Sequence, residues 1–573
     1  MNKNNNNWRF SRAFYVANTM EIFERLAWYG FFALSSLYMS TPKSQGGVGF
    51  SDMERGALQG IIPFFLYLLP VFTGALGDKW GYRKMFILAF AIMTPGYYLL
   101  GQADTFSSFF MAFLMVAFGA ACFKPVVVGT ISHSSNDQNR GLAFGIFYTM
   151  INVGGFIGPL VAGYMRSISW DMVFIMSAFW IAVNFIPALF FYRDPKSVQQ
   201  SQVNFKHIFL EAQHVLGNGR LALCVFPLVI FLMGSGAGWW SYLTTLYISI
   251  FWLAFNWLWH RFSLEQSGSW YKQKIKVSNK PFAVYLLLLT GFWTAYNQLF
   301  YTMPLYIRDF VDTSDLVVML SVFGQGTVEF LAFVDQDLLT EKIQTLLTQA
   351  IPAQQAINEL VHLKVRVPIE EYQSLLSQVQ AGVSVTPEAT AEIAKQWTDA
   401  YRQVNPEYLI NLDFAAIIVC QILVSLVCQK FKSISVLVVG VLVFGGGLLT
   451  AIAANNVLAG GAFAVLAILM MAFGEMITSP KSQEYVASIA PKNQAAMYMG
   501  YYFVSMALGF LFGGLLSGWG YGTVAKEMAQ PELMWSGFAV IALLTSTGLI
   551  WFNRRYIETP LETTSTIKSE VTI

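Results

Sequence analysis

The stretch EIFERLAWYG, residues 21–30, places two carboxylates and one arginine within an otherwise apolar segment that extends from Phe14 to Tyr38. On a helix with about 100° per residue, Glu21, Glu24 and Arg25 fall on one face, so the arginine can pair with either acid. An ionisable side chain inside a membrane is costly and usually faces a protein interior or a water-filled cavity. Whether that cost applies here depends on whether the segment spans a membrane.

The composition of the chain indicates that most of it lies in a membrane. Of its 573 residues, 55% are hydrophobic and only 12% are charged, which is more apolar than a soluble globular domain. A helix needs about 20 mainly apolar residues to cross the hydrocarbon core, and fourteen segments qualify. We expect these spans at approximately 13–38, 55–77, 84–102, 107–131, 141–164, 170–192, 220–237, 241–261, 281–308, 408–429, 434–454, 458–478, 494–517 and 534–553. The sequence therefore predicts an all-α polytopic membrane protein with the lipid bilayer around it.

The positions of basic residues predict the orientation of the spans. The start, MNKNNNNWRF, lacks the apolar core of a cleaved signal peptide, so we expect the first span to be retained. Loops that follow even-numbered spans carry Lys and Arg, and such loops face the cytoplasm. They include Lys79, Arg83, Lys84, Arg193, Lys196, Lys206, Lys272, Lys274, Lys276, Lys280, Lys430 and Lys432. Both termini are therefore expected in the cytoplasm.

Residues 310–407, between the ninth and tenth spans, form an insert that is too long for an ordinary connection. The predicted orientation places this insert outside the cytoplasm. Its first part, DLVVMLSVFGQGTVEFLAFV, is rich in Val and Phe around Gly324 and Gly326, which favours a β-hairpin over a helix. A fifteenth span is the alternative interpretation of this part.

The rest of the insert has helical periodicity. Leu339, Ile343 and Leu346 recur at helical spacing, and Thr386 followed by Pro387 is typical of a helix start. We expect amphipathic helices at 337–350, 368–380 and 387–402. The sequence does not identify a partner for the insert.

Three further spans carry polar groups that lipid would not tolerate. They are Lys124 in the fourth span, Asn152 in the fifth and Glu475 in the twelfth. A lysine and a glutamate on different helices can neutralise each other across a cavity, and a proton or a charged substrate can open such a bridge. Lys124 snorkelling to an interface and Asn152 bonding to a neighbouring helix are the purely structural alternatives.

Several classes of function lack support in the sequence. The four cysteines, Cys122, Cys224, Cys420 and Cys428, lie in apolar spans without paired spacing, so we expect no disulfide framework and no metal site. The net charge of +2 gives no indication of a nucleic-acid partner. No paired catalytic acids, nucleophile and base, or phosphate loop lies in or near the spans, so an enzyme is not expected.

The loop GALGDKWGYRKMF, residues 74–86, joins the second and third spans. Its glycines permit close helix approach and a tight turn, while an acid lies near a basic pair. The pattern resembles the signature loop of the major facilitator superfamily, which has twelve core helices in two bundles. The residues that carry this resemblance, and to which it assigns a conformational role, are Gly74, Asp78, Gly81, Arg83 and Lys84.

Fourteen spans equal that core plus an additional hairpin, an arrangement that resembles prokaryotic members of the proton-dependent oligopeptide transporter family. EIFERLAWYG is similar to the family's Glu-x-x-Glu-Arg motif on the first helix, CFKP to its Phe-Lys-Pro, and FYTMINVGG to its fifth-helix motif. GFWTAYNQ, NPEYLI, FGEMITSP and YMGYYFVSMALG look like segments of its second bundle. The resemblance covers nearly the whole chain except the insert.

The resemblance implies the following organisation, with both termini cytoplasmic in a bacterial inner membrane. We expect an N-terminal six-helix bundle at 1–193, a linker and extra hairpin at 194–280, the first helix of the second bundle at 281–309, the insert at 310–407, the rest of the second bundle at 408–556 and a cytoplasmic tail at 557–573.

The resemblance also implies roles for individual residues. The proton-coupling group comprises Glu21, Glu24, Arg25, Lys124 and Glu475, with Lys124 pairing with Glu475 or binding a peptide carboxylate. The substrate-binding group comprises Tyr29, Tyr67, Lys124, Asn152, Asn297, Asn405, Glu475 and Tyr502. No cofactor is implied, since the proton is the coupling ion.

The sequence departs from the family pattern at several positions. Asn297 stands where members usually carry a glutamate that responds to protons, and asparagine cannot titrate. Phe32 replaces the usual substrate-facing arginine, Trp28 the first aromatic of a Tyr pair, and Tyr502 a more usual Trp. These changes put ordinary dipeptides in doubt as substrates.

The function that the resemblance implies is proton-coupled symport of di- or tripeptides, or of peptide-like solutes, by alternating access. One alternative keeps the fold but changes the cargo to another peptide-like metabolite, such as a siderophore or conjugate, and includes export. A receptor or scaffold without transport is the other alternative, and the several buried charges argue against it.

Overall fold

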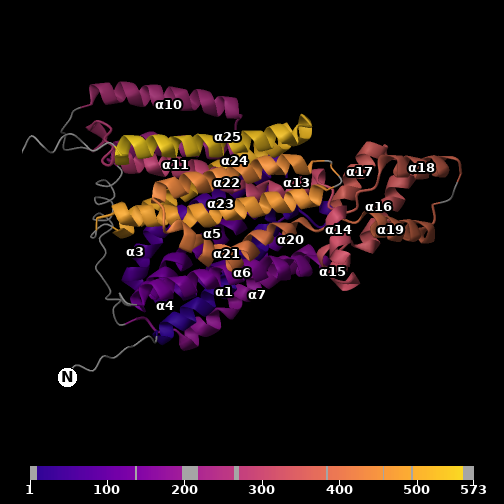
Figure 1. The fold of residues 1–573 in the computed structure, drawn as a ribbon, viewed down its shortest axis with the longest axis horizontal. Coiled ribbons are helices and arrows are strands. Elements are labelled where there is room, and N and C mark those ends of the chain that lie inside the picture. The colour runs from indigo at the N-terminus through magenta and orange to yellow at the C-terminus, as the bar shows by residue number, and fades with distance from the viewer. Residues whose placement is uncertain are drawn as a thin grey trace, which may run out of the picture.

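The computed structural model describes residues 10–135, 139–195, 217–263, 270–382, 385–455, 457, 459–491 and 495–558. The helices run side by side along one axis, and a smaller group of helices projects from one end (Figure 1). Helices occupy all fourteen predicted spans. The described chain contains isolated β-bridges but no strands, so the predicted all-α class is confirmed.

The N-terminal bundle follows from strong local helix signals. Ser51 caps its second span through a capping box with Glu54, and Pro70 begins a new helix at the point where this span breaks in two. The helices are α1 (Arg12–Ser40), α2 (Asp52–Leu68), α3 (Pro70–Trp80), α4 (Tyr82–Gln102), α5 (Phe106–His133), α6 (Arg140–Ile168) and α7 (Trp170–Val183), followed by a π turn (Pro187–Phe191).

The C-terminal bundle contains interrupted helices where the chain approaches the insert. Its first span is divided into α11 (Lys280–Tyr296), α12 (Gln298–Tyr301) and α13 (Met303–Phe310), and its second into α20 (Pro406–Ile410) and α21 (Leu412–Cys428). The remaining helices are α22 (Ser433–Thr450), α23 (Gly460–Ile489), α24 (Ala495–Trp519), which continues as a π turn (Gly520–Glu527), and α25 (Pro531–Phe552).

The extra hairpin consists of α9 (Gly219–Gly236) and α10 (Tyr242–Phe262) and lies outside the two bundles. The helix α9 packs against α2 and α24 through a small apolar core, while α10 lies at the edge of the molecule (Figure 1). Short turns complete the fold at Lys43–Gln45, Trp270–Lys272, Ala451–Ala454 and Asn553–Glu558.

The insert is entirely helical where the structure describes it. Its helices are α14 (Ser314–Ser321), α15 (Gln325–Leu331), α16 (Gln336–Thr348), α17 (Ala353–His362), α18 (Ile369–Gln380) and α19 (Pro387–Tyr401). The expected start at Thr386 is confirmed, since its side chain accepts a hydrogen bond from the Ala389 backbone. The three predicted amphipathic helices are present, and α17 was missed.

The predicted β-hairpin at the start of the insert is wrong. The Val- and Phe-rich stretch forms the two short helices α14 and α15, separated by a turn in which Gly324 has a φ of +102°. A two-stranded hairpin on its own is only marginally stable. As a helix, this stretch packs against α23 through α14. The alternative of a fifteenth span fails too, because the two helices have only eight and seven residues.

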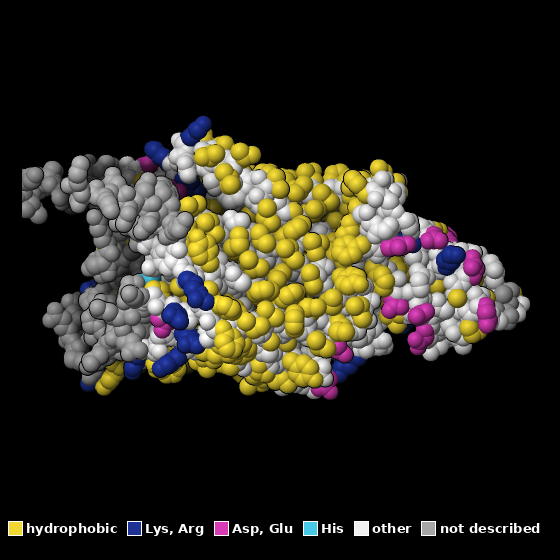
Figure 2. Space-filling view, turned by 90° about the horizontal axis from the view of Figure 1, so that it is seen from below, with side chains coloured by type: hydrophobic (Ala, Val, Ile, Leu, Met, Phe, Trp, Pro, Cys, Tyr) yellow, Lys and Arg dark blue, Asp and Glu magenta, His cyan; other side chains and the backbone are white. Residues whose placement is uncertain are grey.

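The surface agrees with a membrane protein. Ten described helices are long and apolar enough to cross a bilayer, and α1 and α2, among others, fall outside that criterion. On the face seen in Figure 2 a broad apolar band crosses the middle, with Lys and Arg gathered toward the end opposite the insert and Asp and Glu mostly on the insert. The chain therefore has a hydrophobic belt between two polar ends.

Candidate functional site

The charged cluster of α1 is buried inside the protein. Glu21, Glu24 and Arg25 are 3%, 0% and 4% exposed. Arg25 Nε lies 3.1 Å from Glu21 Oε1, and the guanidinium also forms a close ion pair with Glu24. The guanidinium lies 5.6 Å from the ring centre of Tyr29. The pairing expected from helical spacing is thus present, and one arginine faces two acids.

Glycines let α6 approach this cluster closely. A Cβ on Gly154 would lie 2.5 Å from Arg25 Cβ, and one on Gly158 would lie 2.9 Å from the Leu26 carbonyl oxygen. Larger residues would push α6 away from α1. The charged cluster is therefore sealed on this side by backbone rather than by lipid.

Lys124 on α5 lies close to the α1 cluster. Its Nζ lies 4.3 Å from the ring centre of Tyr67 on α2, a cation–π contact. Its charge interacts with those of Glu21 and Glu24 as well as with Arg25. The half-buried lysine and the three charges on α1 form one group with balanced charge.

The predicted pairing of Lys124 with Glu475 is absent from this conformation. Among the described residues, no ion pair joins the two side chains, and Lys124 lies over Tyr67 instead. The physical reason is that the α1 acids already supply negative charge close to the lysine. Glu475 belongs to a separate group on the other bundle.

Glu475 on α23 is surrounded by tyrosines. It is 9% exposed, and the hydroxyl of Tyr296 on α11 hydrogen-bonds to it. Its charge also acts on Tyr29 of α1 and on Tyr148 of α6. Because Tyr29 lies near both Arg25 and Glu475, it links the two charged groups across the interface between the bundles.

A buried acid on α21 went unnoticed in the sequence. Asp413 is 0% exposed, and both of its carboxylate oxygens lack a hydrogen-bond partner in the described structure. Its charge interacts with that of Glu475. The signal was available, since Asp413 is an ionisable residue inside the predicted span 408–429.

The three predicted asparagines make mainly local contacts. Asn152 Nδ2 donates to the Tyr148 carbonyl oxygen at 2.8 Å on its own helix. Asn297 is fully buried at the end of α11, where its Nδ2 donates to the Trp293 carbonyl oxygen at 2.7 Å. Asn405 lies at the start of α20, and its backbone N–H donates to the Leu331 carbonyl oxygen of α15.

These asparagines differ in their distance from the charged groups. Asn152 lies one helical turn after Tyr148, whose hydroxyl interacts electrostatically with Glu475. Asn297 packs against α24, since a Cβ on Gly513 would lie 2.9 Å from its own Cβ. Asn405 lies at the base of the insert. Of the predicted aromatic residues, Tyr502 is fully buried within reach of the Glu475 charge and hydrogen-bonds to Ser482.

The signature loop connects α3 and α4 to the end of the sixth span. Gly81 has a φ of +90°, which a glycine adopts readily, and an added Cβ would lie 3.0 Å from Asp194 Oδ2. The Arg83 backbone N–H donates to Asp194 Oδ1 at 2.9 Å, and its side chain donates to the carbonyl oxygens of Ala188 and Leu189.

The other loop residues agree with this arrangement where they are described. A Cβ on Gly74 would lie 3.3 Å from Pro125, so this glycine lets α3 approach α5 beside Lys124. Lys84 is exposed at the start of α4. Asp78 belongs to α3, and its side chain lies outside the described part of the structure.

The two bundles are joined at the end that carries the insert. Arg55 of α2 donates to the Tyr301 carbonyl oxygen at 3.2 Å and to Ser517 Oγ at 3.1 Å. Arg166 of α6 forms an ion pair of 2.8 Å with the fully buried Glu407 of α20. These contacts hold the two bundles together at that end of the molecule.

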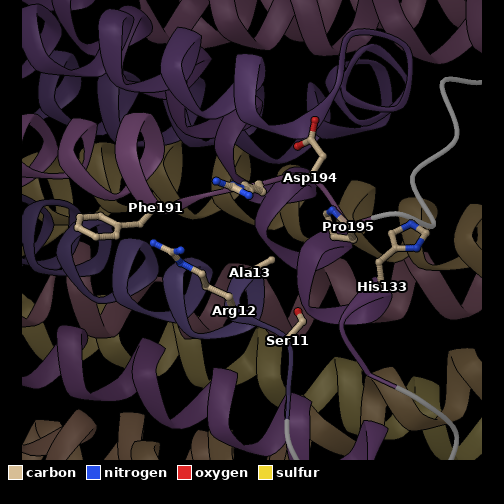
Figure 3. Close-up of a pocket in the computed structure, with 8 residues that line it drawn as sticks. Ser11, Arg12, Ala13, His133, Phe191, Asp194 and Pro195 are labelled. Carbon is tan, nitrogen blue, oxygen red and sulfur yellow. The ribbon is translucent and has the colours of Figure 1, made fainter.

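A cavity of about 450 Å³ lies at the opposite end, among residues at the start of α1, the end of α5 and the chain after α7. In Figure 3 the guanidinium of Arg12 extends toward the ring of Phe191, from whose centre it lies 5.4 Å away. Asp194, which holds the signature loop, also lines this cavity. None of the predicted substrate-binding residues does, so the cavity adjoins the signature loop rather than the charged site.

The described residues contain no group of three or more His, Cys, Asp or Glu placed to hold a metal ion. The site itself is built from acids, bases and tyrosines. These groups can bind protons and charged solutes.

Comparison with known proteins identifies relatives of parts of the chain. The chain is 30% identical over 161 residues to a peptide transporter of Yersinia enterocolitica subsp. palearctica, and the match covers 27% of this chain and 31% of the relative. A riboflavin transporter of Clostridioides difficile is 26% identical over 195 residues, covering 32% of this chain and 43% of the relative. The chain thus matches less than half of the length of either relative.

The fold has close counterparts among solved structures. The crystal structure of a POT family transporter in complex with a thioalcohol conjugated peptide superposes with a TM-score of 0.62 at 15% identity, over 95% of this chain and 96% of that one. At this identity the comparison establishes the arrangement of the helices.

The family itself is established by sequence. The pattern of the Major Facilitator Superfamily matches residues 20–334 and 407–569, which includes both bundles and omits α16 to α19 of the insert. Together with the signature loop and the two bundles, this match shows that the chain belongs to the Major Facilitator Superfamily, a family of transporters.

Proposed function

We propose that this protein is a proton-coupled symporter that moves di- or tripeptides, or peptide-like solutes, by alternating access. The observation that carries the proposal is the pair of charged groups between the bundles. One is the Glu21–Glu24–Arg25–Lys124 group, and the other contains Glu475. A zwitterionic peptide has a carboxylate and an ammonium that complement these two groups.

The geometry supports different roles for the two bundles in binding the substrate. Lys124 and Arg25 supply positive charge on one side for a substrate carboxylate. Glu475 supplies negative charge on the other side for an ammonium, and Tyr29 lies between the two. The similarity to a Yersinia peptide transporter over part of the chain supports the same class of cargo.

The transport cycle follows from competition for the buried charges. A proton that enters from the insert side neutralises Glu21, Glu24 or Glu475, which frees Arg25 or Lys124 to bind substrate and lowers the cost of closing the cavity. Deprotonation on the other side restores the α1 ion pairs and expels the substrate. In the present conformation, the contacts of Arg55 and Arg166 close the insert end. The site between the bundles therefore faces the opposite side.

The charge distribution supports an orientation with both termini in the cytoplasm of a bacterium and the insert outside its inner membrane. Lys and Arg gather at the end opposite the insert in Figure 2, as expected for a cytoplasmic face.

The proposal is tested with purified protein in liposomes that contain a pH-sensitive dye. Di- and tripeptides are added outside under a negative-inside potential. We expect interior acidification with a subset of peptides, and no acidification with the Glu475→Gln variant. If the folded and inserted wild-type protein gave no interior acidification with any peptide of the panel, peptide symport would be contradicted.

One comparison bears on a second class of cargo. The partial similarity to a riboflavin transporter extends over a longer stretch than the match to the peptide transporter. Adding riboflavin and peptide conjugates to the same assay, in both directions, distinguishes a different cargo or export from peptide uptake.

A further inference from the structure

Asp413 and Glu475 are two buried acids on neighbouring helices of the C-terminal bundle. Asp413 lies in the first turn of α21 and is 0% exposed, and Glu475 lies on α23, against which α21 packs. Both oxygens of Asp413 and Oε2 of Glu475 lack a hydrogen-bond partner in the described structure. Three of the four carboxylate oxygens are therefore buried and unsatisfied.

Within the part of the chain that the structure describes, no positive charge compensates this pair. The titratable groups facing it are the hydroxyls of four tyrosines, namely Tyr296 on α11, Tyr148 on α6, Tyr29 on α1 and Tyr502 on α24. Among the described Lys, Arg and His residues, none forms an ion pair with either acid. The N-terminal group differs, since two acids there face Arg25 and Lys124.

Two carboxylates that share an enclosed site without a cation do not both remain ionised, because like charges repel and burial disfavours each charged form. A proton shared between the two acids removes one charge and supplies the O–H donor that the unsatisfied oxygens require. The C-terminal pair therefore requires a proton, whereas the negative charge of the N-terminal group is balanced by Arg25 and Lys124.

The segment that carries Asp413 also touches the N-terminal bundle. Two residues earlier, Asn411 Nδ2 donates to the Phe156 carbonyl oxygen of α6 at 2.9 Å. The next residue, Phe414, packs on Gly155 of α6 and contacts Tyr29 with ring centres 4.7 Å apart. A change of charge at Asp413 thus acts directly on the surface along which the bundles move.

We propose that Asp413 is a second proton-carrying residue of the transport cycle and shares its proton with Glu475. The inference rests on the proposed function and adds a proton site in the C-terminal bundle. The proton comes from water on the insert side and bonds to one carboxylate oxygen of the pair. A substrate ammonium neutralises the single negative charge that remains on the pair while the proton is bound. After the substrate has left on the opposite side, the proton leaves to water on that side as well.

The first test measures the number of protons transported with each substrate molecule. Reversal potentials are recorded in liposomes for the wild type, Asp413→Asn and the control Asp337→Asn, an exposed acid on the insert helix α16. We expect Asp413→Asn to transport one proton fewer per substrate and Asp337→Asn to match the wild type. An unchanged ratio in Asp413→Asn overturns the proposal.

The second test does not depend on transport. Infrared difference spectra between alkaline and acidic conditions report the carbonyl stretch of protonated carboxyl groups in the purified protein. We expect Asp413→Asn and Glu475→Gln to lose the same band, and the double variant to lose no more than either, since the proton is shared. If the two single variants lost separate bands that add up in the double variant, or if Asp413→Asn lost no band, the two acids would not share a proton.

The two tests separate the inference from the proposed function. Failure of the wild type to transport any solute overturns symport, while the infrared spectra still decide whether the acids share a proton. Asp413→Glu keeps the carboxyl group and is expected to restore both the band and the proton ratio. Thermal unfolding verifies that each variant is folded, and Asn is close to Asp in shape.

Discussion

At the scale of single residues, the site consists of two groups with different charge balance. Arg25 and Lys124 offset the acids of α1, whereas Glu475 and Asp413 face each other without a base. The difference predicts distinct consequences when an acid is neutralised in each group. In the N-terminal group, removal of one acid leaves a base free, while in the C-terminal group it removes a proton site.

Glu24→Gln tests the coupling role of the N-terminal group. Glutamine cannot take up a proton, so we expect proton-driven uptake to fall by at least about tenfold, which is about 1.4 kcal/mol. Exchange of labelled for unlabelled substrate needs no net proton movement and is expected to persist. The measurement compares uptake with counterflow in liposomes, and loss of counterflow in the folded variant would indicate a structural role for Glu24.

At the scale of elements, the loop between α3 and α4 and the insert show how short segments are held by specific contacts. The loop depends on the backbone conformation of Gly81 and on the carboxylate of Asp194. The insert has its own apolar core of α16 to α19 and is tied to the bundle through α13. Each attachment is a place where one substitution changes the element without touching the charged site.

Gly81→Ala tests the loop. A residue with a side chain at φ +90° costs about 1–3 kcal/mol, and the new Cβ would press on Asp194. We expect a lower unfolding temperature and slower transport. Gly145→Ala is the control, because a Cβ there meets nothing within 4 Å. Equal stability of the two variants would show that the loop conformation carries no strain.

His362, the last residue of α17, tests the contact between the insert and α13. Burial and the nearby positive charge of Arg308 lower the pKa of His362 to about 4. In this buried position, His362 therefore binds a proton less readily than a solvent-exposed histidine, which has a pKa of 6.5. As the pH falls from about 6.5 to 4, the contact loses about 1.4 kcal/mol per pH unit.

Hydrogen exchange of α17 measures this effect. We expect exchange to accelerate as the pH falls below about 6.5, after correction for the intrinsic rate. His362→Gln, which cannot be protonated, is expected to abolish the pH dependence while leaving α13 and α17 in contact. The same pH dependence in His362→Gln would assign the effect to another group.

At the scale of the whole molecule, transport requires the two bundles to separate and close at alternate ends. At the insert end they approach through glycines, since a Cβ on Gly514 would lie 2.3 Å from the Gly60 nitrogen and 2.5 Å from the Gly56 carbonyl oxygen. The tight fit between α2 and α24 lets the polar contacts of Arg55 form. Closure at this end therefore depends on the absence of side chains.

Gly514→Val tests this closure. Overpacking costs typically about 1–3 kcal/mol, which reduces the closed population by about fivefold to a hundredfold or more. Spin-label distances between α2 and α24 at the insert end are expected to lengthen, and uptake is expected to fall. Gly537→Val on α25 is the control, because a Cβ there meets nothing within 4 Å. Unchanged distances in Gly514→Val would contradict closure through these glycines.

The sequence by itself determined the features that depend on local composition. Apolar length identified the spans, and the cost of burying a charge singled out Glu21, Glu24 and Arg25 as an inward-facing group. Spacing on one helix predicted their pairing, because residues three and four apart are neighbours whatever surrounds the helix. Glycines and charges in the loop at residues 74–86 indicated the family.

Only the tertiary structure decided which helices bring their charges together. Lys124 lies over Tyr67 rather than against Glu475, and Asp413 joins Glu475 from a helix about 60 residues away along the chain. The start of the insert is helical because α14 finds a packing surface on α23, which outweighs its strand-like composition. Contacts between distant segments depend on how the helices pack, and no local pattern encodes that packing.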